Sequence, residues 1–171
     1  MEANRKDKII IEVRTRTINF TVMGNSNLLT SILFTGLLAG TLDILAAIFL
    51  LAGGNAVGTF KFIASGVFGK AAFEGGNDMV AWGVLFHFMI ALSFTTAYFL
   101  MYPKLPFLKR NKWVNAVVYG CIVWAVMNLI VLPMSQVPQR PFNWEMALKN
   151  IAILVVCIGL PVAWLGDKLK N

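Results

Sequence analysis

Four long runs of apolar residues, separated by shorter polar segments, dominate the pattern of this chain. The runs cover residues 28–51, 79–102, 114–133 and 147–166. Each has about the 20 residues or more that an α-helix needs to cross a hydrocarbon core about 30 Å thick. The pattern therefore predicts an all-α, polytopic membrane protein with four transmembrane helices.

The connection between the first two runs has a helical pattern of its own. Within residues 57–73, apolar side chains recur at intervals of three and four, and a Gly75-Gly76-Asn77 sequence follows. Lys61 and Lys70 interrupt the segment, which makes it a poor fifth span. We expect an amphipathic helix here, either interfacial or re-entrant.

Basic residues predict the orientation in the membrane. Five of the 15 Lys and Arg residues lie before the first run, four between the second and third runs, and two at the C-terminus. Basic residues concentrate on the cytoplasmic side of a membrane, so both termini are predicted to be cytoplasmic. The 57–73 helix then lies on the outer side, and a fifth span would move the four-charge loop outside.

Residues 1–27 form a polar, basic tail before the transmembrane domain, which we place at 28–171. Ile11, Val13 and Thr15 alternate with charged residues, as in a short β-strand. A lone strand is not stable and would need a partner. A partnered strand and a disordered tail both remain open.

Composition agrees with a membrane protein and excludes several classes of function. Hydrophobic residues make up 58% of the chain and charged residues only 13%, against about a quarter charged in soluble domains. The net charge of +7 resides at the ends of apolar runs, so nucleic acid is not an expected partner. With one histidine and no HExxH, CxxC, GxSxG or P-loop motif, we expect no metal, no cofactor and no catalytic residues.

Three polar residues lie inside the apolar runs, at a similar depth. Measured from the middle of each run, Asp43 and His87 lie roughly 5 Å and Asn128 roughly 7 Å toward the outer side. Polar side chains in a membrane face the bundle interior and find partners there. The three residues are therefore candidates for a proton, ion or ligand site. Hydrogen bonds that only hold the helices together are the alternative.

Small residues mark expected sites of close helix packing. Gly36 and Gly40 form a GxxxG pattern, and Gly40 shares a helix face with Asp43. This face packs either within the subunit or against a second copy. Ser65 and Gly69 give the 57–73 helix a similar smooth face.

Two charged residues beside the 57–73 helix are possible outer-side contributors to the site. Lys70 could reach toward Asp43, or it could extend to the membrane surface as long basic side chains often do. Glu74 follows it at the outer interface.

Four sequence blocks resemble a family of small bacterial integral membrane proteins of unknown function. The blocks are GLLAGTLDILAA, FIASGVFGKAAFEGG, GVLFHFMIA and VMNLIVLPMS, and they occur in the order of the predicted helices. The resemblance implies a bacterial protein of the inner membrane. It implies no activity and no catalytic residue, and it does not cover the tail.

The leading functional hypothesis is a non-enzymatic transport, channel or ligand-binding role. Asp43, His87 and Asn128 would form its site, the 57–73 helix would cover it, and a homo-oligomer could complete a pathway. The alternative is an accessory or assembly subunit that contacts a partner in a membrane complex. A third hypothesis is a lipid-modifying enzyme with His87 and Asp43 as an acid–base pair. Beyond these, the lipid bilayer is the expected partner.

Overall fold

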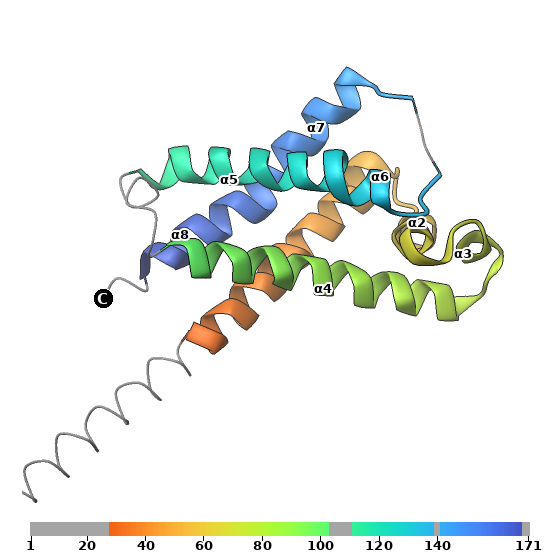
Figure 1. Ribbon diagram of the computed structural model, residues 1–171, viewed down its shortest axis with the longest axis horizontal. Helices are drawn as coiled ribbons and strands as arrows, with labels where there is room; N and C mark the ends of the chain where they lie inside the picture. The colour runs from red at the N-terminus through yellow and green to blue at the C-terminus, as the bar shows by residue number, and fades with distance from the viewer. Residues whose placement is uncertain (1–27, 103–110, 139–140, 169–171) are drawn as a thin grey trace, which may run out of the picture.

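The computed structural model describes residues 28–102, 111–138 and 141–168. These residues form helices and connecting turns, with no strand among them (Figure 1). The strand proposed for the tail lies outside the described residues. The all-α prediction is confirmed for the part of the chain that the structure describes.

Within the described ranges, four helices are long and apolar enough to cross a membrane, as predicted: Leu28–Leu51, Asn77–Met101, Lys112–Met134 and Trp144–Gly166. The observed ends lie within about one helical turn of the predicted ones. The first span consists of an α-helix over residues 28–46 and the π-helical turn η1 (Ala47–Leu51). The second span is α4 (Asn77–Met101).

The third and fourth spans each change their helical winding part of the way along. The third comprises α5 (Lys112–Val126), η4 (Met127–Val131) and α6 (Leu132–Met134); the fourth comprises α7 (Trp144–Leu154), η5 (Val155–Gly159) and α8 (Leu160–Lys168). A proline follows each of these π-helical turns closely, at Pro133 and Pro161. Proline has no N–H to donate to the preceding turn. The carbonyls of that turn therefore accept hydrogen bonds from residues five positions on, as in a π-helix, instead of four.

Asparagine side chains fix where the third and fourth spans begin. Asn111 accepts a hydrogen bond from the backbone N–H of Trp113 at 2.9 Å, and Asn143 accepts one from Met146 at 3.1 Å. An N-cap side chain satisfies a helix N–H that would otherwise have no partner. These caps explain why both spans start a little before the purely apolar runs.

The segment predicted as one helix over 57–73 is two helices, so that prediction was wrong in its extent. The first, α2 (Ala56–Phe68), ends at Gly69, and α3 (Ala71–Glu74) follows. Gly69 has a φ of +58° and a ψ of −140°, a backbone conformation that is open to glycine but strained for residues with a Cβ, and the helical hydrogen bonds stop there. Gly69 therefore serves as a helix end. Ser65, which we paired with it on a smooth face, is fully buried.

Helix α2 runs across the spans and packs closely on α4. Figure 1 shows α2 nearly end-on, whereas α4 and α5 are seen from the side. A Cβ at Gly83 would lie 2.1 Å from the carbonyl oxygen of Phe60, so only glycine permits this approach. We call this end of the bundle the α2 end.

Two side chains tie α2 to its surroundings. The Lys61 ammonium donates to the carbonyls of Gly75 at 2.6 Å and Phe73 at 3.2 Å. From the segment after the third span, the Gln136 amide Nε2 donates to Val67 O at 2.7 Å, and its backbone N–H donates to Gly66 O at 3.0 Å. These bonds fix α2 both to the segment that leads into α4 and to the segment that follows the third span.

Replacing Gln136 with alanine is expected to weaken this attachment by about 1 kcal/mol, because one side-chain hydrogen bond is lost. Thermal unfolding of the purified protein measures the change. Ser93→Ala is the control, since its exposed hydroxyl donates to the Met89 carbonyl in its own helix. Equal stability for both variants would show that the Gln136 side chain does not hold α2.

Glycines allow the spans to approach one another at two crossings. The first is between the first span and α4, where a Cβ at Gly36 would lie 2.6 Å from Leu92 and a Cβ at Gly40 would lie 3.0 Å from Ala91. The GxxxG face therefore packs within the subunit. At the second crossing, Gly159 of the fourth span meets the Ala116 carbonyl of the third.

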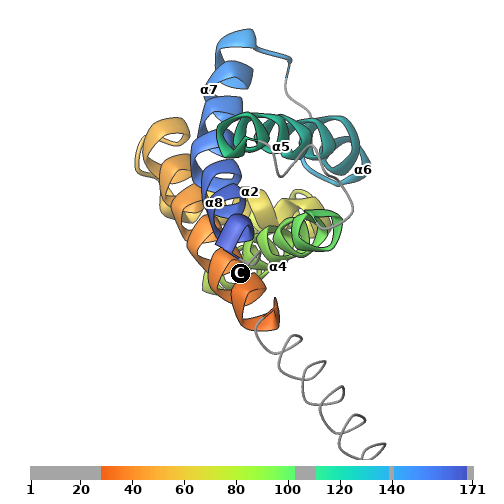
Figure 2. The same ribbon diagram turned by 90° about the vertical axis from the view of Figure 1, so that its left-hand side faces the viewer.

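The second and third spans are joined at the end away from α2. The Asn115 amide donates to the Tyr98 hydroxyl, and the Tyr119 hydroxyl donates to the Phe94 carbonyl. Tyr98 and Val123 belong to the buried core at this level. Toward the α2 end, α4 and α5 diverge, and α2 occupies the opening (Figures 1 and 2).

Candidate functional site

A cavity of about 730 Å³ lies between the four spans, beneath α2. Every span and α2 contribute to its lining, which is mainly apolar. The polar lining residues are Asp43, Asn55, Thr59, His87, Asn128 and Asn150. The π-helical turns η1, η4 and η5 all supply lining residues, and such turns are frequent at functional sites.

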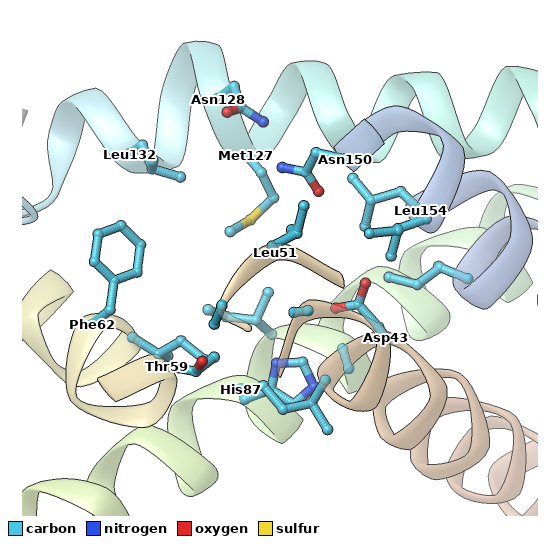
Figure 3. A pocket seen from close by; sticks show the side chains of 18 of the residues that line it. Asp43, Leu51, Thr59, Phe62, His87, Met127, Asn128, Leu132, Asn150 and Leu154 are labelled. Atoms are coloured by element: carbon cyan, nitrogen blue, oxygen red, sulfur yellow. The ribbon is translucent and has the colours of Figure 1, made fainter. Parts of the chain in front are cut away.

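Asp43, His87 and Asn128 all line this cavity, although they come from three different spans (Figure 3). The similar membrane depth that the sequence predicts for these residues therefore corresponds to one cavity in the structure. Each has a different set of contacts, however, and the three do not form a direct hydrogen-bonded network with one another.

His87 is buried and joins the first two spans. Its Nε2 lies 2.8 Å from the carbonyl oxygen of Gly40. A carbonyl can only accept, so Nε2 carries the hydrogen and donates it. In the neutral imidazole, Nδ1 is then an acceptor. The glycine that permits close approach of the two helices also supplies the partner of the histidine.

Asp43 is half-buried on the cavity wall. Within the described part of the chain, its carboxylate makes no hydrogen bond and no ion pair. The oxygens of Asp43 therefore retain their capacity to accept hydrogen bonds from a molecule in the cavity.

Asn128 lies in η4 and bonds to its own helix. Its Nδ2 donates to the carbonyl of Trp124 at 2.9 Å, four residues earlier. This bond orients the amide, and no hydrogen bond joins it to Asp43 or His87. The side-chain oxygen of Asn128 remains able to accept a hydrogen bond.

Asn150 of α7 completes the polar lining and was not predicted. It lies five residues from Val155, the middle of the span Trp144–Gly166, or about 7 Å toward the α2 end. This is the depth of Asn128. We missed it because the predicted run began at residue 147, which placed Asn150 near the membrane surface, where an amide is ordinary.

Asn55 and Thr59, also not predicted, come from the start of α2. The Asn55 side chain caps the helix by accepting from Gly58 N at 2.8 Å, and the Thr59 hydroxyl donates to Asn55 O at 2.8 Å. Their signal in the sequence is the asparagine three residues before Gly58, a pattern typical of a helix start.

The two charged residues proposed as outer-side contributors do not reach the cavity. Lys70 and Glu74 are both exposed and do not line it. Phe73, between them in sequence, does line it. Lys70 therefore does not extend to Asp43, and its position fits the surface interpretation.

A metal site is not formed by the described residues. They contain no group of three or more His, Cys, Asp or Glu side chains that could hold a metal ion. A mainly apolar lining with six polar side chains is suited to a molecule with an apolar body and a few polar groups. Comparison with protein-family models, with curated proteins and with solved structures finds no match for this chain.

Proposed function

We propose that this protein binds a small molecule in the cavity beneath α2, in a transport or ligand-binding role without catalysis. The cavity itself is the observation that carries this proposal. Ligand sites in proteins typically have about 300–1,000 Å³ and apolar walls with a few placed polar groups. A volume of about 730 Å³ with six polar lining residues fits that description.

The proposed location is the inner membrane of a bacterium, with both termini in the cytoplasm. The support is the distribution of basic residues and the resemblance of the four sequence blocks. In this orientation the cavity lies in the outer half of the membrane, and α2 covers it on the outer side. Tyr98, Asn115 and Tyr119 close the bundle on the cytoplasmic side.

A role as an accessory subunit is the second candidate, and one contact favours it. The hydrogen bond from His87 to Gly40 holds two spans together whether or not a ligand is present. Such bonds are typical of helix packing in membranes. Purification of the tagged full chain distinguishes the two: an accessory subunit should bring a different protein in fixed stoichiometry.

Access of water-soluble reagents to the cavity tests the proposal directly. In a Cys121→Ser, Cys157→Ser background, Met127→Cys would place a thiol in the cavity lining. Leu129→Cys, two residues on in the same π-helical turn, would place one on the outward surface, where Leu129 is 67% exposed. With a small cationic methanethiosulfonate, we expect Met127→Cys to react about tenfold faster or more, because a thiolate forms only where water reaches.

The rate is measured in lipid nanodiscs, so that lipid covers the outward surface as it does in a membrane. Equal slow rates at both positions would mean that solutes do not enter the cavity. That outcome would contradict a transport or ligand-binding role and would favour the accessory subunit.

A further inference from the structure

We infer that the molecule bound in this cavity is an organic cation, an amine carrying an apolar body. The inference rests on the proposed function, because it names the ligand class of the same site. Three properties of the lining lead to it: its hydrogen-bonding capacity, its charge and its size.

Three polar side chains of the lining already use a donor within the protein. His87 donates through Nε2 to Gly40, Asn128 donates to Trp124, and Thr59 donates to Asn55. Each of the three keeps an acceptor, namely an imidazole nitrogen, an amide oxygen and a hydroxyl oxygen, and the amides of Asn55, Asn128 and Asn150 also keep N–H donors. A ligand that donates several hydrogen bonds fits this set, and a protonated amine does so.

The charge of the lining points the same way. Among the residues that the structure describes, Asp43 is the one acidic residue of the lining and no Lys or Arg accompanies it; the one other titratable side chain, His87, donates to the Gly40 carbonyl. Lys61 of α2 donates instead to the carbonyls of Gly75 and Phe73. A carboxylate inside a membrane is costly unless an opposite charge compensates it. A ligand ammonium group beside Asp43 would supply that charge.

Size and apolarity select an organic cation over a metal ion. A hard metal ion takes about six oxygen ligands at 2.0–2.6 Å, whereas this cavity has room for a molecule of many atoms. Phe62, Phe73 and Phe94 are among its walls. Aromatic rings pack against apolar groups and also attract cations. Asn150, from the facing span, can hydrogen-bond to a second polar group of the ligand (Figure 3).

Equilibrium dialysis of the purified full chain in nanodiscs tests the ligand class with three matched probes. They are 2-(1-naphthyl)ethylamine, the neutral 2-(1-naphthyl)ethanol and the anionic 1-naphthylacetate. We expect saturable binding of the amine, about tenfold or more tighter than that of the alcohol, with the anion weakest. Asp43→Asn should abolish the preference for the amine. Asp78→Asn, an exposed carboxylate outside the cavity, should retain it.

The outcomes separate this inference from the proposed function. Saturable binding of the alcohol or the anion as tight as that of the amine would overturn the cation inference and leave a ligand site standing. Saturable binding of none of the probes, together with an unreactive Met127→Cys, would overturn both. The comparison of probes on the unmodified protein needs no variant, so it stays decisive even if Asp43→Asn does not fold.

Discussion

Replacing Gly83 with alanine is expected to lower the free energy of unfolding by about 2–3 kcal/mol and to loosen α2 from the bundle. The added Cβ would lie 2.1 Å from the Phe60 carbonyl oxygen and 2.6 Å from its carbonyl carbon. Both atoms belong to the backbone, so no side chain can rotate away and the whole helix must shift. Equilibrium unfolding in mixed micelles measures the stability, and hydrogen exchange of α2 measures its attachment.

Gly66→Ala is the matched control, because Gly66 is a glycine inside α2 where an added Cβ meets no close neighbour. Its nearest neighbours to an added Cβ are Ser135 and Val137, both at 3.8 Å, which is ordinary contact. Alanine is favoured over glycine inside a helix by about 1 kcal/mol, so this variant should be as stable as the parent or more so. If both variants lost the same stability, the close approach of α2 and α4 would not be the cause.

The sequence predicted the four spans because their signal is a property of the chain itself. A span needs about 20 apolar residues whatever surrounds it, and the two lysines of the 57–73 segment argued against a fifth. The break at Gly69 could not be predicted in the same way. A glycine inside an apolar pattern is tolerated in many helices, and its positive φ is visible only in the structure, where the Gln136 side chain packs beside it.

The close contact between α2 and α4 also could not be predicted from sequence patterns. Gly83 has no small residue four positions away on either side, since Met79 and His87 occupy those positions. Its partner is a backbone carbonyl in another helix. Sequence spacing identifies faces of one helix but does not state which helix packs against them.

The candidate site could also be predicted only in part. The depth of a residue in the membrane can be counted along the sequence. This count correctly grouped three of the six polar residues that line the cavity. The hydrogen-bond partners of these residues could not be predicted. His87 and Asn128 bond to backbone carbonyls, which every residue has. The three side chains therefore line a shared cavity, and the bonds of His87 and Asn128 go to the backbone.

Substitutions at His87 and Asp43 should affect stability in opposite ways. His87→Leu removes the bond between the first two spans and is expected to cost about 1–2 kcal/mol. Asp43→Asn removes a charge that has no hydrogen bond within the described residues, so stability should stay the same or rise. Unfolding of both variants in the same mixed micelles gives the comparison, with Ser93→Ala as the reference for a surface hydroxyl on α4.

His87→Gln sharpens the test, because a glutamine amide can still donate to Gly40 and should restore part of the stability that leucine loses. The two roles proposed for the polar residues differ most clearly at Asp43. If the carboxylate only held helices together, Asp43→Asn would unfold more easily, as His87→Leu does. A stable Asp43→Asn protein that no longer prefers the amine probe would instead show that the carboxylate is kept in the membrane for a ligand.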